Sequence, residues 1–222
     1  MRSTSFVFPV GNERTTAVEY GARDSQAELL LAPGAGAPQT HPWIVEVAGA
    51  LSDRGVHVLT FNFLYAEEGR RTPDKNDVLE AAWRAAIHAA RGRSVAKGNR
   101  LFIGGKSMGG RIATQVVSKG DVEVAGLVLL GYPLHPPGKP TQLRAAHLSG
   151  VRAPMLFVQG SRDPFGTPAE LAPVLETLPR APRLFVVEGG DHSFNVPKRS
   201  GESHETVIAR VADEVVRFMG VR

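Results

Sequence analysis

Short apolar runs alternate with longer amphipathic segments along almost the whole chain, and this alternation limits the folds that the sequence can adopt. The run from Val124 to Leu130, for example, contains only apolar residues and glycine. Strands that are buried on both faces of a parallel sheet have this character. The same reasoning predicts strands at Thr15–Tyr20, Ala27–Leu31, Val56–Phe61, Arg100–Gly104, Val124–Leu130, Met155–Gly160 and Arg183–Val187.

The segments between these runs have the 3.6-residue period of amphipathic helices. In Glu205–Met219, the apolar residues share one stripe and the charged residues lie opposite them. Strands that alternate with such helices predict an α/β fold, in which helices cover both faces of a mostly parallel, twisted sheet. Helices are predicted at Ile44–Asp53, Asp77–Ala90, Gly110–Ser118, Pro168–Leu178 and Glu205–Met219.

The first two strand-like runs, Ser5–Val10 and Thr15–Tyr20, flank the turn signal Gly11-Asn12 and predict an antiparallel hairpin at the sheet edge. The 222 residues fit one domain over residues 1–222, without an internal repeat or a linker. The longest irregular stretch runs from Gly131 to Pro154, with a helical pattern around Gln142–Leu148. This stretch is too short to fold as a separate cap, so we expect a lidless domain.

The chain has no cysteine, which excludes disulfides, thiolate metal sites and a cysteine nucleophile. Its formal net charge is +4, but its 26 basic residues are scattered among 22 acidic ones. We therefore expect no nucleic-acid partner. The N-terminus lacks the apolar core of a signal peptide, and no run of about 18 apolar residues occurs. We expect a cytoplasmic protein without a membrane partner.

The segment Gly105-Lys106-Ser107-Met108-Gly109 fits the pattern G-x-S-x-G and stands between a predicted strand and a predicted helix. In this context a sharp turn lifts the serine hydroxyl above the carboxyl ends of the strands, where it acts as a nucleophile. The small neighbours let the strand and the helix approach closely. The alternative is a glycine-rich turn in which Ser107 only caps the helix. The position after a buried strand favours the nucleophile.

Two nucleotide-binding motifs are excluded by the spacing of the glycines. A phosphate loop ending at Gly105-Lys106-Ser107 requires glycine where Arg100 stands. A dinucleotide fingerprint starting at Gly34 requires a third glycine where Gln39 stands. We expect no cofactor and no metal.

A serine nucleophile needs a base, and the base needs a carboxylate that orients it. Asp163 follows the strand predicted at Met155–Gly160, and His192 follows the strand predicted at Arg183–Val187. Both residues should lie at the carboxyl edge of the sheet with Ser107, in the chain order Ser, Asp, His. The sequence therefore predicts the catalytic triad Ser107, Asp163 and His192.

Alternatives stay open for the acid and the base. Asp163 precedes a proline and could simply start a turn, and His192 could be an ordinary loop histidine. His41 is the main rival of His192 because it follows a glycine-bearing loop, and we interpret it as a cavity-rim or helix-start residue. Asp191 is disfavoured as the acid because the side chains of adjacent residues usually point apart.

The loop that follows Ala27–Leu31 contains Gly34-Ala35-Gly36, and a glycine-bearing loop at this place commonly supplies an oxyanion N–H. We expect the oxyanion hole from the backbone N–H groups of Ala35 and Met108. Arginines in the segment Leu64–Asn76 could attract a substrate carboxylate, although solvated surface arginines are the commoner case. The residues that we single out for substrate binding are Gly34, Gly36, His41, Tyr65, Arg70 and Arg71.

Together these residues resemble the alpha/beta-hydrolase superfamily from Thr15 to Met219. The short, lidless arrangement is similar to the dienelactone-hydrolase-like group. Dienelactone hydrolases proper carry a cysteine nucleophile, which this chain lacks, and a histidine often stands where this chain has Pro33. The segments Phe61–Tyr65, Arg70–Asp74 and Gly105–Gly110 look like a narrower branch. That branch includes the hydrolase-like domain of a eukaryotic histone-acetyltransferase-complex subunit.

The sequence therefore predicts a serine hydrolase of the carboxylesterase type, which cleaves esters or related small acyl substrates through an acyl-enzyme intermediate. One alternative is a hydrolase-like interaction module without activity, and another is an acyltransferase that uses the same triad. The presence of all three triad candidates favours an enzyme. A monomer and a homodimer are both compatible with the sequence.

Overall fold

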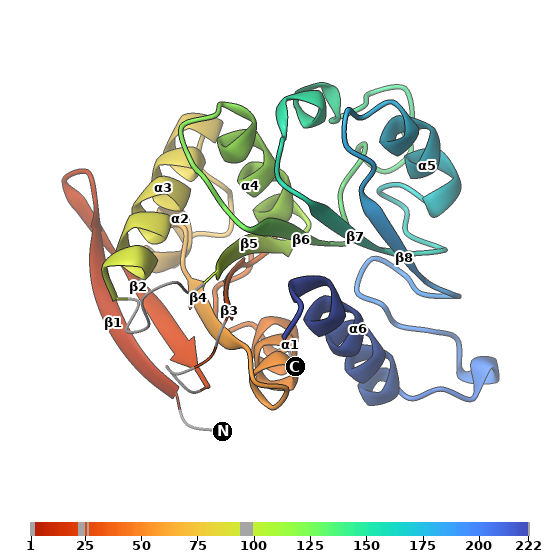
Figure 1. Cartoon of the computed structure of the whole chain (residues 1–222), viewed down its shortest axis with the longest axis horizontal. Helices are drawn as coiled ribbons and strands as arrows, with labels where there is room; N and C mark the ends of the chain where they lie inside the picture. The colour runs from red at the N-terminus through yellow and green to blue at the C-terminus, as the bar shows by residue number, and fades with distance from the viewer. Residues whose placement is uncertain (1–2, 22–24, 26, 94–99, 222) are drawn as a thin grey trace.

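The computed structural model describes residues 3–21, 25, 27–93 and 100–221. Its strands form one eight-stranded sheet in the order β1-β2-β4-β3-β5-β6-β7-β8 (Figure 1). The strands are β1 (Ser3–Val10), β2 (Glu13–Tyr20), β3 (Ala27–Ala32), β4 (His57–Phe61), β5 (Arg100–Lys106), β6 (Gly126–Leu130), β7 (Met155–Gly160) and β8 (Arg183–Val187).

The six strands from β4 to β8 in this order are parallel to their neighbours. The other two strands lie at one edge, where β2 pairs antiparallel with both β1 and β4. The β1–β2 hairpin turns at Gly11, whose φ of 60° lies in the left-handed region that glycine adopts without strain. The mostly parallel sheet and the predicted edge hairpin are confirmed.

Helices cover both faces of the sheet, as predicted (Figure 1). On one face α1 (Pro42–Ser52) packs against α6 (His204–Met219). On the other face α3 (Asn76–Arg93) packs against α4 (Met108–Ser118), and α5 (Pro168–Glu176) lies on the same side. The short elements are α2 (Leu64–Glu67) and the 3-10 turns η1 (Ala146–Gly150) and η2 (Lys198–Ser200).

Strand β3 shows why both faces need a cover, since all of its residues are buried. Leu30 belongs to the apolar cluster under α3 and α4. Leu29 and Leu31 belong to the cluster under α1 and α6. Successive side chains of a strand point to opposite faces, so a continuously apolar strand contributes to two cores.

Two segments differ from the sequence prediction. The stretch between β6 and β7 contains only η1 as regular structure, and η1 begins later than the helix expected at Gln142–Leu148. Helix α2 forms inside the loop expected at Leu64–Asn76, where the Asp74 carboxylate accepts a hydrogen bond from the Tyr65 N–H (3.0 Å) in its first turn. Neither segment builds a cap, within the residues that the structure describes.

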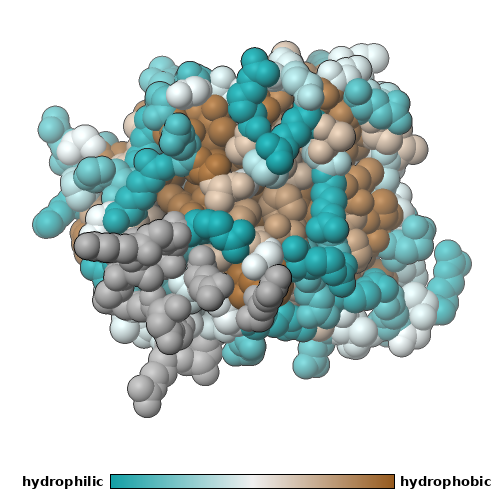
Figure 2. Space-filling model, in the orientation of Figure 1, coloured by the Kyte–Doolittle hydropathy of each residue, from teal (hydrophilic) through white to brown (hydrophobic). Residues whose placement is uncertain are grey.

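The helices of the described ranges are all too short or too polar to cross a membrane. Figure 2 shows the face drawn in Figure 1, on which hydrophilic residues are spread between hydrophobic areas. Surface arginines pair with acidic residues, as in Arg54–Asp213 and Arg84–Asp121. The charges are thus interspersed on the surface as they are in the sequence.

Candidate active site

The turn that carries Ser107 joins β5 directly to α4. Ser107 has φ 49° and ψ −115°, a conformation that glycine adopts readily and other residues rarely. The turn is possible because its neighbours lack side chains. A Cβ atom at Gly105 would lie 2.4 Å from the Ala32 carbonyl oxygen, and one at Gly109 would lie 2.5 Å from that of Pro33. The glycines therefore build the sharp strand-to-helix turn that the motif predicts.

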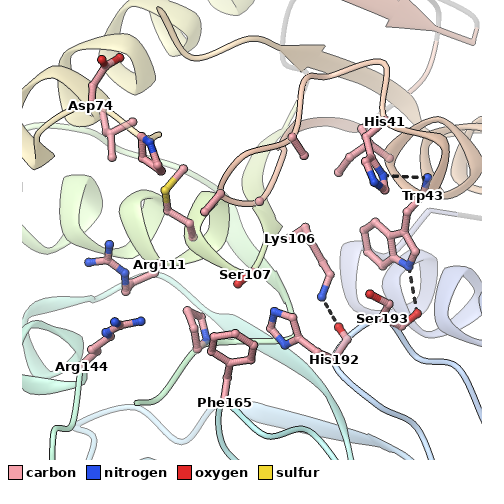
Figure 3. A pocket seen from close by; sticks show the side chains of 18 of the residues that line it. His41, Trp43, Asp74, Lys106, Ser107, Arg111, Arg144, Phe165, His192 and Ser193 are labelled. Atoms are coloured by element: carbon pink, nitrogen blue, oxygen red, sulfur yellow. Dashed lines mark hydrogen bonds between the residues drawn. The ribbon is translucent and has the colours of Figure 1, made fainter. Parts of the chain in front are cut away.

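A cavity of about 620 Å³ opens above this turn (Figure 3). Segments from both halves of the chain line it, including the turn itself, the loop after β3, and the loops after β7 and β8. Ser107 and His192 both line it, and both are drawn near the centre of Figure 3. The cavity therefore lies at the carboxyl ends of the parallel strands, where open α/β sheets bind ligands.

The loops after β7 and β8 bring Asp163 and His192 together. The Nδ1 of His192 lies 2.8 Å from Oδ2 of Asp163. Asp163 is only 1% exposed, whereas the His192 side chain is 20% exposed towards the cavity. In the neutral imidazole, a hydrogen bond from Nδ1–H to the carboxylate selects the tautomer in which Nε2 is the proton acceptor. Among the described residues, no hydrogen bond links the Ser107 hydroxyl to this ring.

Gln159 holds the Asp163 carboxylate in place. Its side-chain amide donates to Oδ2 of Asp163 (2.9 Å) and to the Gly166 carbonyl oxygen (2.7 Å). Its carbonyl oxygen accepts from the Tyr132 N–H (2.9 Å). The other Asp163 oxygen accepts from the Phe165 N–H (2.8 Å). The sequence analysis missed Gln159, although a glutamine in an apolar strand was a signal that a polar partner lies nearby.

The neighbouring carboxylate, Asp191, has different partners. It accepts hydrogen bonds from the backbone N–H groups of Ser193 (2.8 Å) and Asn195 (2.9 Å). Burial is the largest single effect and would raise the pKa of Asp191, but these N–H donors, the Asn195 side chain and the Lys106 charge together lower it. Asp191 therefore shapes the loop that carries His192, and Asp163 contacts the ring.

Lys106 is a charged residue at the cavity that the sequence analysis considered only as part of a phosphate loop. It is 8% exposed, and its ammonium group donates to the His192 carbonyl oxygen. The same group lies 5.3 Å from the ring centre of Trp43 and 5.7 Å from that of Phe194. Burial lowers the pKa of Lys106 to about 8, although Asp163 and Asp191 act in the opposite direction.

The two expected oxyanion donors both lie at the cavity. Met108 is the first residue of α4, where backbone N–H groups have no carbonyl partner within the helix. Ala35 lines the cavity from the loop after β3. That loop contacts the turn, since a Cβ atom at Gly34 would lie 3.7 Å from the Ser107 Cβ. The positions of Met108 and Ala35 are thus compatible with two N–H groups that converge near Ser107.

The residues predicted for substrate binding divide into two groups. Gly34 and His41 line the cavity. His41 also caps α1, because its Nδ1 accepts from the Trp43 N–H (3.3 Å). It is thus both a rim residue and a helix-start residue, in agreement with our interpretation.

The other four residues, Gly36, Tyr65, Arg70 and Arg71, lie outside the lining of this cavity, and their part in substrate binding stays a prediction. Tyr65 is fully buried, and its hydroxyl accepts from the Gly36 N–H (3.2 Å) and donates to the Gly34 carbonyl oxygen (3.4 Å). Arg70 pairs with Glu68 and with Asp74 (2.7 Å). Arg71 lines a separate depression beside Gly36 and Arg70. Tyr65 thus supports the loop after β3, to which Gly36 belongs.

The far end of the cavity carries two arginines that the sequence analysis missed, Arg111 and Arg144 (Figure 3). Arg111 lies four residues after Ser107 on α4, and this spacing was a signal that its side chain shares the face of the turn. Nothing in the irregular stretch around Arg144 pointed to the cavity. Within the described ranges, no cluster of three or more histidine, aspartate or glutamate side chains could hold a metal ion.

Comparison with known proteins gives the same fold. A family described as alpha/beta hydrolase domain matches residues 25–220. A dienelactone hydrolase from Anabaena variabilis ATCC 29413 has a TM-score of 0.78 at 22% identity, covering 100% of this chain and 99% of its own. An alpha-beta serine hydrolase homologue from Coxiella burnetii has a TM-score of 0.77 at 17% identity, covering 99% and 98%. A lidless serine hydrolase from Xanthomonas campestris has a TM-score of 0.73 at 19% identity, covering 98% and 95%. Because the family match spans nearly the whole chain, this protein belongs to the alpha/beta-hydrolase domain family.

Proposed function

We propose that this protein is a serine hydrolase that cleaves esters or related small acyl compounds. Ser107 is the nucleophile, His192 is its base, and Asp163 orients the imidazole. The single observation that carries the proposal is the 2.8 Å contact between His192 and Asp163. It lies beside the cavity that Ser107 lines from its strained turn. A serine, an imidazole and a buried carboxylate arranged in series are what acyl transfer requires.

In the first step, the Ser107 oxygen attacks the acyl carbon while Nε2 of His192 accepts the hydroxyl proton. The N–H groups of Met108 and Ala35 stabilise the oxyanion that forms. His192 then returns the proton to the leaving alcohol, and the acyl group stays on Ser107. Water, deprotonated by His192, releases the acid and restores the serine. The buried Asp163 carboxylate stabilises the imidazolium in both steps.

The shape of the cavity supports a small substrate. Its volume of about 620 Å³ is within the range of sites for drug-sized molecules. Phe165 packs against the His192 ring, with ring centres 4.3 Å apart, and narrows the space beside the base. The described segments include no lid over the cavity. We therefore expect short acyl chains, or acyl groups exposed on larger molecules, to be the preferred substrates.

Labelling with a fluorophosphonate probe tests this proposal. The probe should attach to one residue, and peptide mass spectrometry should locate it on Ser107. Ser193 provides an internal comparison because it lines the same cavity but does not stand on the strand-to-helix turn. Ser107→Ala should abolish both the labelling and the hydrolysis of p-nitrophenyl butyrate. The exposed Ser149→Ala, on η1, is the matched control and should behave as the wild type.

A wild-type protein that is neither labelled nor active would refute the catalytic role, provided that it is folded by circular dichroism. An adduct on Ser193 would refute the assignment of the nucleophile. Product analysis in water, with and without a primary alcohol, distinguishes hydrolysis from acyl transfer to the alcohol.

A further inference from the structure

Two guanidinium groups lie side by side at the far end of the cavity, away from His192 (Figure 3). Arg111 comes from α4 and Arg144 from the segment that precedes η1. The position of Arg144 is fixed through its backbone. Its N–H donates to the Leu134 carbonyl oxygen (2.7 Å), and its carbonyl oxygen accepts from the Tyr132 hydroxyl (2.7 Å). A segment that appears irregular in the sequence is thus held so that its arginine lines the cavity.

Neither guanidinium group has an acidic partner within the described ranges. The ion pairs of these ranges involve other arginines, such as Arg54, Arg84 and Arg93. The Nε of Arg111 is buried and has no hydrogen-bond partner among the described residues. Buried N–H groups are almost always paired, because an unpaired one loses its hydration without compensation. The Arg111 guanidinium therefore keeps a donor that a further group in the cavity can use.

The surroundings do not neutralise these charges. Burial is the largest effect on the Arg111 guanidinium and lowers its pKa, and the charge of Arg144 acts in the same direction. His147 is close by, and burial together with Arg111 lowers its pKa to about 4, so it is neutral at physiological pH. Asp74 also lines the cavity, but its oxygens accept hydrogen bonds from Arg70 (2.7 Å) and the Tyr65 N–H (3.0 Å). The excess positive charge at this end is thus left for a ligand.

The spacing along α4 sets the distance between this end and the nucleophile. Arg111 lies four residues after Ser107, which is roughly 6 Å along a helix axis. Helical side chains lean towards the N-terminus of their helix, so the Arg111 side chain leans back towards the turn. A group held by Arg111 should therefore lie several bonds from a carbon attacked by Ser107, and roughly four to six bonds is the separation to test.

We propose that Arg111 and Arg144 form an anion subsite and that the preferred substrate carries a carboxylate at this distance from its scissile acyl carbon. The planar guanidinium groups, with five N–H donors each, match a carboxylate in geometry and charge. The subsite rests on the proposed function, because it defines the substrate class of the same cavity.

Matched esters test the subsite. The p-nitrophenyl monoester of adipic acid is compared with p-nitrophenyl hexanoate, which has the same chain length and no charge. A second pair, 3-carboxyphenyl hexanoate and phenyl hexanoate, carries the charge on the alcohol side. For one of the pairs we expect the wild type to prefer the charged ester by about tenfold or more in kcat/KM, and the responsive pair identifies the side of the substrate that carries the anion.

Arg111→Met and Arg144→Met should each lower this preference by about tenfold, and Arg111→Lys should lower it less because it keeps the charge but loses the planar fork. Arg180→Met, at an exposed position after α5, is the control and should keep the wild-type preference. An equal kcat/KM for charged and neutral esters in both pairs would overturn the subsite.

A binding measurement separates this proposal from the catalytic one. Adipate is titrated into Ser107→Ala, with and without Arg111→Met and Arg144→Met, and binding is followed by calorimetry. We expect binding that weakens by about tenfold or more with each lost guanidinium, irrespective of turnover. Binding that is absent or insensitive to both arginines would refute the subsite, even if Ser107 is labelled by the fluorophosphonate. Arginine-dependent binding without labelling would instead refute the proposed hydrolysis.

Discussion

The charged groups at the two ends of the cavity differ in their partners. At the His192 end, the Asp163 carboxylate is bound by His192 and Gln159, and the Lys106 ammonium contacts a carbonyl oxygen and two aromatic rings. At the other end, the guanidinium groups of Arg111 and Arg144 have no acidic partner among the described residues. The difference indicates that the first end is preorganised by the chain itself, whereas the second is completed only by a ligand.

The largest expected effect concerns the preorganised end. Asp163→Asn should reduce kcat for ester hydrolysis by roughly 10⁴-fold, because an asparagine no longer fixes the imidazole tautomer or stabilises the imidazolium. Steady-state kinetics on p-nitrophenyl butyrate provides the measurement. Asp191→Asn is the matched comparison, since this carboxylate bonds to Ser193 and Asn195 and not to the ring. If Asp191→Asn caused the greater loss, the acid would have to be reassigned.

The next effect concerns the charge of Lys106. The pKa of Lys106 is lowered to about 8 in the folded protein, against its ordinary value of 10.5 in the unfolded chain. Between these two pH values the unfolded chain binds more protons than the folded protein. The contribution of Lys106 to the unfolding free energy therefore grows as the pH rises through this window. It is lost as the pH falls through about 8. From pH 7 to pH 9.5, the wild type should gain about 2 kcal/mol in unfolding free energy relative to Lys106→Met.

Urea unfolding at both pH values measures this gain. Lys119→Met, which removes a half-exposed lysine, is the control for general alkaline effects. A constant difference between the wild type and Lys106→Met would mean that the ammonium group is not destabilised by burial.

A smaller effect should appear at the end with unpaired charges. Without ligand, Arg111→Met should raise the unfolding free energy by about 1 kcal/mol, because it removes a buried N–H donor that has no partner. Thermal denaturation in an anion-poor buffer measures the change, and added adipate should reverse the order of the two proteins. Destabilisation by Arg111→Met in that buffer would show that the chain already satisfies this guanidinium group.

The smallest effect is a shift in one titration. Arg111 contributes to the low pKa of His147, which is about 4, although burial is the larger cause. Arg111→Met should therefore raise the pKa of His147 by less than about one unit. Nuclear magnetic resonance of the imidazole C–H protons provides the measurement, with the distant His57 as the internal reference. An unchanged His147 would place the Arg111 charge farther away than the structure does.

Much of the fold was predictable because its signals are local. Continuous apolar runs identified the parallel strands, and the glycines around Ser107 identified the turn. The proximity of Asp163 and His192 followed from one rule, that loops after parallel strands meet at one edge. The resemblance to the narrower histone-acetyltransferase branch, the oligomeric state and the cellular location stay predictions.

The positions of several side chains could not be predicted, because they depend on tertiary contacts that leave no local pattern in the sequence. Tyr65 follows a strand end and was expected at the substrate, but its ring stacks on Phe63, with centres 6.1 Å apart, and its hydroxyl bonds to the loop after β3. Arg144 lies in a stretch where a helix was expected at Gln142–Leu148 and only η1 forms, and long-range contacts through Tyr132 and Leu134 bring it to the cavity. Side-chain positions of this kind are set by tertiary packing and cannot be read from the sequence pattern.

The glycines of the turn also have an evolutionary consequence. A methyl group at Gly104, in β5 just before the turn, would lie 1.8 Å from the Val128 carbonyl oxygen, so replacement of this glycine by another residue damages the scaffold. Ser107 itself is held through its backbone, whose N–H donates to the Leu130 carbonyl oxygen (3.0 Å). A descendant gene could therefore lose the hydroxyl and still encode an intact protein. In this architecture, the proposed catalysis can be lost in one mutational step, while the surrounding fold is inherited unchanged.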